Sequence, residues 1–203
     1  MTKLIALTGY SRSGKDTAAD ALVDLGYSRC AFGDIIKAMV NEAPIEEFSV
    51  FRDWLESSGR DRKRIADIAH GWCLVKLCGV SPFTQNDEVK PLLRALLEDY
   101  GIWRYDEVTR RFFSTLPELC VNSRLCRAAE GHLWRQKGGI LVEIVRPGNT
   151  AHTPVEAGWM QELTDAGLID VILYNDSTPE NLGLAIKQVA SGTTGIIRAS
   201  RLG

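Results

Sequence analysis

Residues 9–17 read Gly9-Tyr10-Ser11-Arg12-Ser13-Gly14-Lys15-Asp16-Thr17, and no other part of the chain says as much about its fold. Two glycines five positions apart let the main chain curl so closely that consecutive N–H groups point inward at an anion. The lysine after the second glycine can reach the β- and γ-phosphates of a nucleotide. The stretch therefore predicts a cradle for a nucleoside triphosphate.

The segments on either side of this loop have the order that such a cradle requires. Residues 4–8 form a short apolar run that predicts a buried parallel strand. Residues 17–25 form a helix-forming run that Gly26 closes. An ordinary strand, turn and helix without a nucleotide is the alternative, and the combination of spacing and order argues against it.

The residue after the lysine departs from the usual pattern. Asp16 stands where a serine or threonine commonly directs its hydroxyl at Mg²⁺. A carboxylate at this position can hold the magnesium directly or through water, orient the nucleophile, or cap the helix, and Thr17 supplies a hydroxyl next to it. Asp16 and Thr17 are the predicted metal-binding residues, and the sequence leaves the three roles of Asp16 open.

Composition limits the class of protein. A chain of 203 residues with 45% hydrophobic content suits one domain with a sizeable core. The formal net charge of -2 argues against binding nucleic acid through general basicity. No charged leader precedes an apolar segment and no run of eighteen apolar residues occurs, so we expect a cytoplasmic protein without a membrane partner.

Strand-like and helix-like segments alternate along most of the chain. Strands are predicted at residues 4–8, 27–32, 119–122, 140–145 and 169–174. Helices are predicted at residues 17–25, 35–42, 45–55, 64–77, 106–113 and 125–136, with further helices starting near residues 90 and 178. The alternation predicts an α/β fold in three layers, with a parallel five-stranded sheet between helices.

Two segments interrupt this regular order within the single predicted domain. The first, at about residues 43–85, is helical material that we interpret as an insertion on the substrate side. The second, at about residues 147–167, contains Pro147, Gly148, Pro154 and Gly158, a composition that suits a mobile segment. We predict that this second segment closes over the phosphates as a lid and excludes water.

Candidate site residues follow from position and charge. Ligands bind at the carboxyl ends of the strands in a parallel sheet, so residues that directly follow strands should converge there. The predicted ligands of the ATP phosphates are Gly9, Arg12, Ser13, Gly14, Lys15, Asp16 and Thr17. The predicted catalytic residues are Lys15, Asp16, Asp34, Arg124 and Arg146. The predicted contacts to the acceptor are Asp34, Lys37, Arg94, Arg104, Arg124 and Arg146. Asp34 also has a structural alternative, as the cap of the helix that follows it.

With these segments assembled, the chain resembles the bacteriophage deoxynucleoside monophosphate kinases, a branch of the P-loop nucleoside monophosphate kinase fold. Residues 12–17 are similar to the R-S-G-K-D-T loop of that family, which accounts for Asp16. Residues 31–37 are similar to its F-A-D-P-L-K segment, and residues 138–148 to its G-G, strand, R-P-G block. The resemblance covers most of the chain outside residues 43–85.

Two blocks of that family are only partly present. Residues 122–128 read Asn-Ser-Arg-Leu-Cys-Arg-Ala where the family reads D-V-R-F-P-N-E, so Arg124 is kept while the acid and the proline are lost. Residues 152–156 approximate the family's H-x-S-E block with one extra residue. The resemblance implies a contact between Glu156 and the substrate.

The resemblance implies an enzyme that uses ATP and Mg²⁺ to phosphorylate deoxynucleoside 5′-monophosphates to diphosphates, in the host cytoplasm if a virus encodes it. A close alternative is phosphorylation of a hydroxyl on a hydroxymethylated pyrimidine in DNA, because the substrate-side motifs are altered and residues 60–64 are densely basic. A second alternative is a regulatory module that binds a nucleotide without transferring phosphate. The partner is thus a small nucleotide, or DNA in the first alternative, and a homodimer stays open.

Overall fold

A computed structural model describes residues 2–201 of the chain. The chain divides into two compact units. Unit 1 comprises Met1–Ala31 and Leu116–Gly203, and unit 2 comprises Phe32–Thr115. None of the helices within the described residues combines the length and apolar content that a membrane-spanning segment needs.

Unit 1 is built on a parallel sheet. Its strands are β1 (Leu4–Thr8), β2 (Ser28–Cys30), β3 (Cys120–Asn122), β4 (Ile140–Val145), β5 (Val171–Tyr174) and β6 (Gly195–Arg198). They lie in the order β2-β3-β1-β4-β5-β6, and every neighbouring pair is parallel. β1 therefore lies between β3 and β4. Because all three strands are parallel, the loops that follow them begin at the same end of the sheet although they are distant in sequence. The predicted α/β class with a parallel sheet is confirmed.

The predicted count of five strands is wrong, because the described sheet has six. The additional strand, β6, has only four residues, and three of them, Gly195, Ile196 and Arg198, are exposed. A short edge strand of this kind lacks the alternation of apolar and polar residues that marks a strand in a sequence. Its pairing with β5 is therefore visible only in the folded sheet.

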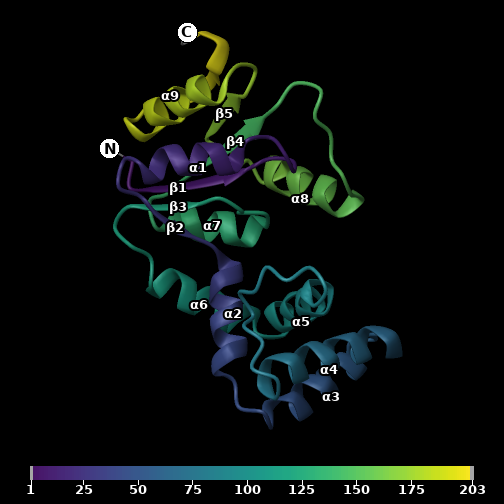
Figure 1. Ribbon diagram of the computed structural model, residues 1–203. Helices are drawn as coiled ribbons and strands as arrows, with labels where there is room; N and C mark the ends of the chain where they lie inside the picture. The colour runs from purple at the N-terminus through teal and green to yellow at the C-terminus, as the bar shows by residue number, and fades with distance from the viewer. Residues whose placement is uncertain (1, 202–203) are drawn as a thin grey trace. The chain divides into compact units, whose positions relative to one another are not determined.

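Helices cover both faces of this sheet (Figure 1). They are α1 (Lys15–Val23), α7 (Ala128–Gln136), α8 (Pro154–Asp165) and α9 (Pro179–Ala190), and a short 3-10 helix spans Ala199–Arg201. α1 and α9 bury Leu22 and Ile186 against Val142 of the sheet. α7 and α8 lie on the opposite face, and the hydroxyl of Thr8 in β1 donates to Met160 Sδ of α8.

The second predicted strand is shorter than expected. The prediction covers residues 27–32, but β2 ends at Cys30 and Phe32 begins helix α2 (Phe32–Glu42). The ring of Phe32 stacks on Phe112, with centroids 3.9 Å apart, and this packing belongs to unit 2. Asp34 consequently lies in the first turn of α2.

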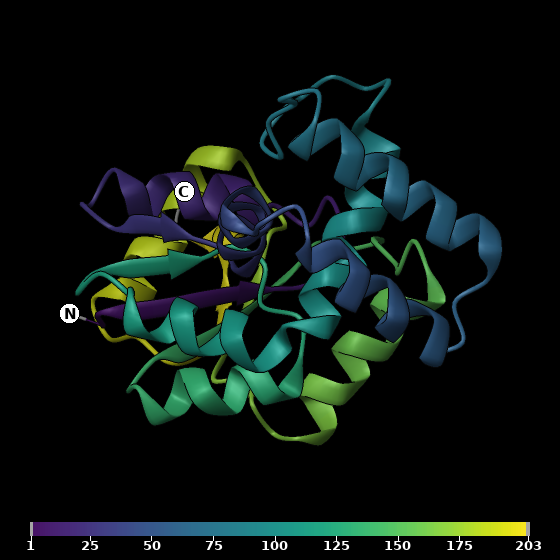
Figure 2. The same cartoon turned by 90° about the horizontal axis from the view of Figure 1, so that it is seen from below.

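Unit 2 is entirely helical. It contains α2, α3 (Glu47–Ser57), α4 (Arg62–Lys76), α5 (Lys90–Trp103) and α6 (Tyr105–Ser114), which Figure 2 shows from a second side. Phe51, Trp72 and Tyr100 are buried and the centroids of their rings lie within 6.4 Å of one another. This aromatic core gives unit 2 a hydrophobic centre of its own.

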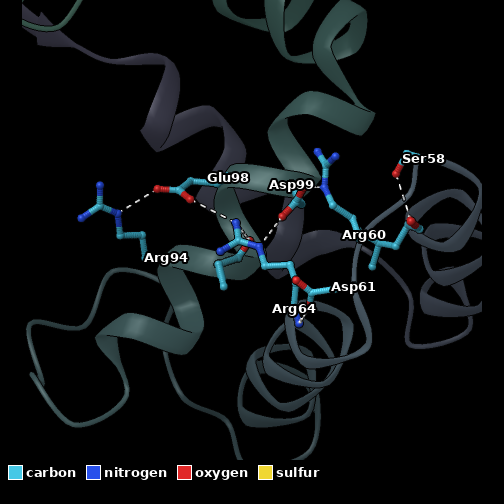
Figure 3. A network of polar contacts seen from close by, with 9 residues as sticks. Ser58, Arg60, Asp61, Arg64, Arg94, Glu98 and Asp99 are labelled. Carbon is cyan, nitrogen blue, oxygen red and sulfur yellow. Dashed lines mark hydrogen bonds and ion pairs between the residues drawn. The ribbon is translucent and has the colours of Figure 1, made fainter. Parts of the chain in front are cut away.

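The basic run at residues 60–64 joins two helices of unit 2 (Figure 3). The carboxylate of Asp99 on α5 is buried, and it accepts hydrogen bonds from Arg60 Nε at 2.6 Å and Arg64 Nε at 2.7 Å. Asp61 caps α4 by accepting from the main-chain N–H of Arg64 at 2.7 Å. Two of the four basic side chains of this run therefore serve the packing of α4 on α5.

Candidate functional site

Residues 9–14, here called the glycine loop, connect β1 to α1 in unit 1. Gly9 has a φ angle of 124° and Gly14 has a φ angle of 107°, values that residues other than glycine rarely adopt. A Cβ atom on Gly9 would lie 2.4 Å from the carbonyl oxygen of Ile144 in β4. A Cβ atom on Gly14 would lie 2.5 Å from Asn175 Nδ2. Both glycines are thus required by the backbone and by close approach to neighbouring strands.

Lys15 is the first residue of α1 and its side chain returns to the glycine loop. Its Nζ atom donates to the carbonyl oxygens of Gly9 and Tyr10, each at 2.7 Å. Burial lowers the pKa of Lys15, and the carboxylates of Glu156 and Asp16 oppose this shift. These two hydrogen bonds hold the Lys15 ammonium group against the glycine loop.

Two asparagines brace the glycine loop from the carboxyl ends of other strands. Asn175, directly after β5, donates from Nδ2 to the carbonyl oxygen of Ser13 at 2.8 Å. Asn149, after β4, donates from Nδ2 to the carbonyl oxygen of Ser11 at 2.8 Å. Neither residue is among the predicted site residues. Asn175 carries a usable signal, since it immediately follows a predicted strand.

Glu156, in the first turn of α8, contacts the tip of the loop. Its Oε1 atom accepts from the main-chain N–H of Ser11 at 2.5 Å and from the Ser11 hydroxyl at 2.8 Å. Its Oε2 atom accepts from the main-chain N–H of His152 at 2.7 Å. Desolvation favours the neutral acid, but these donors outweigh it and hold the pKa of Glu156 below its ordinary value. Glu156 is therefore an anion at the edge of the loop.

Asp16 and Thr17 follow Lys15 on the exposed side of α1. Arg29 of β2 contacts the Asp16 carboxylate, with Nη2 3.4 Å from Oδ1, and donates to the Asp16 carbonyl oxygen at 3.0 Å. The same guanidinium lies 3.5 Å from Asp20 Oδ1. The side chain of Asp16 is 72% exposed, so this pairing leaves its carboxylate accessible.

Asn122 is the last residue of β3, and Arg124 and Arg146 follow β3 and β4 at the carboxyl ends of these strands. Asn122 is fully buried and its Oδ1 accepts from the main-chain N–H of Arg124 at 2.9 Å, while its Nδ2 finds no partner among the described residues. Arg124 is exposed and close enough to Lys15 to contribute to the lowering of its pKa. Arg146 is exposed and lines a cavity of about 50 Å³ with Tyr10, Ser13, Glu143 and Asn149.

The other predicted acceptor contacts belong to unit 2, and each is paired with a carboxylate there. Lys37 Nζ lies 3.0 Å from Asp34 Oδ1. Arg94 Nε lies 2.8 Å from Glu98 Oε1. Arg104 Nη2 lies 3.0 Å from Glu47 Oε1.

Arg104 also lines a cavity of about 160 Å³ within unit 2. Its charged lining residues are Glu42, Glu47, Glu107, Arg104 and Arg111. Tyr100 lines it as well, donates from its hydroxyl to Glu47 Oε1 at 2.7 Å, and has a pKa raised by burial. With three acids against two arginines, this lining does not carry the excess positive charge that favours a phosphate group.

Comparison with solved structures gives several matches, among them the following two. One is described as dephospho-CoA kinase from Campylobacter jejuni, with 14% sequence identity, a TM-score of 0.44, and coverage of 94% of this chain and 96% of that chain. The other is described as TT1252 from Thermus thermophilus, with 19% identity, a TM-score of 0.43, and coverage of 96% and 99%. No protein-family model and no curated protein matches the chain.

Proposed function

We propose that the chain is a P-loop kinase that transfers a phosphoryl group from ATP to a deoxynucleoside 5′-monophosphate with the help of Mg²⁺. The observation that supports this most directly is the glycine loop. Its two glycines leave no room for a Cβ atom, and Lys15 lies against the carbonyl oxygens of the same loop. Such a loop between a buried strand and a helix N-terminus suits a polyphosphate.

The residues of unit 1 fit ATP and magnesium. Main-chain N–H groups at residue 12 and residues 14–17, with the Lys15 ammonium, would hold the phosphates, whereas the N–H of Ser13 donates to the carbonyl oxygen of Tyr10. The Ser13 hydroxyl is buried without a partner among the described residues, which leaves it available to a ligand. Asp16 and Thr17 would hold the metal, directly or through water. Mg²⁺, when bound, neutralises charge on the β- and γ-phosphate oxygens.

The chemistry asks the protein for alignment and for positive charge. In the transfer, an oxygen of the acceptor phosphate forms a bond to the γ-phosphorus while the bond between that phosphorus and the ADP oxygen breaks. Lys15 and Arg12 would serve the ATP phosphates, and Arg124 and Arg146 the transferring group or the acceptor. A planar guanidinium suits phosphate because it makes two parallel hydrogen bonds.

A monophosphate acceptor agrees with this set of side chains. A phosphate monoester is already anionic near neutral pH, so it requires little help from a general base. Asp34, which pairs with Lys37 in the first turn of α2, would therefore hold the acceptor's sugar or hydroxyl rather than remove a proton. We further propose that residues 147–167, of which 154–165 form α8, close over the phosphates and exclude water.

The alternative acceptor, a hydroxymethylated pyrimidine in DNA, rests partly on the basic run at residues 60–64. Arg60 and Arg64 are engaged with buried Asp99, so only Arg62 and Lys63 of that run remain for phosphate contacts. A non-transferring nucleotide-binding module is the remaining alternative, and the same assay distinguishes it.

The experiment is incubation with γ-labelled ATP, Mg²⁺ and each acceptor in turn: the four deoxynucleoside monophosphates and duplex DNA with hydroxymethylated pyrimidine. We expect transfer to at least one monophosphate. Lys15→Ala should lose several powers of ten in turnover while keeping the fold, because the main chain forms most of the cradle. Lys137→Ala, at the exposed C-cap position of α7, is the matched control and should keep full turnover. Transfer to DNA alone would reject the proposed acceptor, and tight ATP binding without any transfer would favour the regulatory module.

A further inference from the structure

Three hydrogen-bond donors converge on one carboxylate at the tip of the glycine loop. The main-chain N–H and the hydroxyl of Ser11 donate to Glu156 Oε1, and the main-chain N–H of His152 donates to Oε2. All three contacts are 2.8 Å or shorter. Donors at both oxygens suit an ionised carboxylate, which only accepts hydrogen bonds.

Helix capping explains only the contact between Glu156 and the main-chain N–H of His152. Thr153 is the N-cap of α8 and its hydroxyl accepts from the main-chain N–H of Glu156 at 3.1 Å. A glutamate in the first helical turn commonly reaches back to a main-chain N–H near the cap, which accounts for His152. It does not account for Ser11, which lies 145 positions away and belongs to the phosphate-binding motif.

The electrostatic surroundings suit an anion with more charge than a carboxylate. Burial lowers the pKa of Lys15. The nearby Glu156 carboxylate opposes this shift, and the nearby Arg124 guanidinium adds to it. Converging N–H and O–H donors beside cations are the elements of a phosphate-binding site.

We propose that the N–H and hydroxyl of Ser11 with the N–H of His152 form a phosphoryl subsite, and that Glu156 occupies it as an internal substitute until a phosphate ligand displaces it. The proposal deepens the proposed function, because the ligand is a phosphoryl group of either the ATP or the acceptor. Displacement requires only rotation of the Glu156 side chain.

The consequence is competition between Glu156 and phosphate ligands. Neutralising Glu156 removes a negative charge from the position that the ligand must occupy, and like charges in such proximity are strongly unfavourable. Binding of phosphate ligands to wild-type protein should therefore be weakened by Glu156, and Glu156→Gln should relieve this.

The test is calorimetric titration of the full chain with inorganic phosphate, ATP and a deoxynucleoside monophosphate as separate ligands. We expect Glu156→Gln to bind at least one of them about tenfold more tightly than wild type. The ligand whose affinity rises identifies the source of the phosphoryl group. Glu162→Gln is the control, since Glu162 is on the same helix and contacts Arg127 and the Ala128 N–H instead, and its affinities should stay within about twofold of wild type. Unchanged or weaker binding by Glu156→Gln for all three ligands would overturn the proposal.

Carbodiimide labelling gives a second, structural readout, because the reagent modifies accessible carboxyl groups. In wild type, saturating phosphate ligand should move the Glu156 carboxylate away from the Ser11 and His152 donors and increase its labelling. Labelling of Glu156 that does not increase with saturating ligand would contradict displacement. Neither readout uses turnover, so failure of phosphoryl transfer with tighter binding by Glu156→Gln would reject the proposed function and leave this subsite standing.

Discussion

Asn175 Nδ2 donates a hydrogen bond of 2.8 Å to the main-chain oxygen of Ser13, and so joins the end of β5 to the glycine loop. The same Nδ2 atom lies 2.5 Å from the position that a Cβ atom on Gly14 would occupy. The Asn175 amide can therefore reach Ser13 because Gly14 has no side chain in its way. The loop conformation depends on a residue that lies 162 positions away in the sequence.

Gly14→Ala should therefore damage both stability and nucleotide binding. Its Cβ would collide with Asn175 Nδ2 and lie 2.9 Å from Leu182 Cδ2, in addition to the strain of φ 107. We expect a loss of about 2 kcal/mol or more in the free energy of unfolding, measured by urea denaturation, and loss of measurable ATP binding by calorimetry.

Gly26→Ala provides the control for this prediction. Gly26 has φ +92, but no neighbouring atom lies within 4 Å of the position that its Cβ would take, so the substitution carries backbone strain without collision. We expect a loss of about 1–2 kcal/mol with ATP affinity unchanged. Equal effects of the two substitutions on ATP affinity would show that Asn175 does not shape the loop.

Asp16→Asn should raise the Mg²⁺ concentration needed for half-maximal phosphoryl transfer, by about tenfold, because a carboxylate ligand becomes a neutral amide. A magnesium titration of initial rates at saturating ATP measures this. Asp20→Asn is the matched control, since Asp20 pairs with the same Arg29 guanidinium at 3.5 Å. A similar shift in both variants would mean that Asp16 acts through Arg29 and not through the metal.

Asp99→Asn should destabilise unit 2. Asp99 is 2% exposed and pairs with Arg60 and Arg64, so the substitution removes the buried anion that both guanidinium groups share and leaves Arg64 only its contact with Glu98. Removing one partner from a buried ion pair commonly costs about 3–5 kcal/mol, and we expect the lower end of this range because the Arg60 and Arg64 side chains are 31% and 33% exposed. Glu98→Gln, which alters a 47% exposed partner of Arg64, should cost less than about 1 kcal/mol. Chemical denaturation of both variants checks this, and equal losses would contradict a special role for the buried carboxylate.

Glu130 should make stability depend on pH. Burial raises the pKa of Glu130 from 4.5 to about 7, although the N–H groups of Cys126 and Arg127 partly oppose this. The folded chain then keeps a proton between these pH values that the unfolded chain releases. Its contribution to stability is complete below pH 4.5 and is lost as the pH rises through 7, by an amount on the order of 3 kcal/mol.

Glu130→Gln isolates this effect because the amide stays neutral and can still accept both hydrogen bonds. The difference in unfolding free energy between variant and wild type should grow in favour of the variant as the pH rises from about 5 to about 8. Denaturant titrations at several pH values measure it, and a difference that does not change with pH would refute the assignment.

Short-range patterns in the sequence predict much of the fold. The spacing of Gly9 and Gly14 predicts a tight loop because positive φ angles belong to glycine, and both residues have them. Apolar runs at residues 4–8 and 140–145 predict buried strands, since a parallel sheet covered by helices requires apolar residues on both of its faces. These properties depend on neighbouring residues, which a sequence displays directly.

The amino-acid sequence alone was therefore sufficient for the loop, the α/β class and the positions of most helices. The folded chain was needed to show which side chains surround the loop. Asn149 and Asn175 reach it because β4 and β5 lie in succession beside β1, and Glu156 reaches it from the first turn of α8. The same is true of β6, which joins the sheet, and of Arg60 and Arg64, which serve a buried carboxylate. Strand order and side-chain pairing arise from contacts between distant segments, and no periodicity or local propensity encodes them.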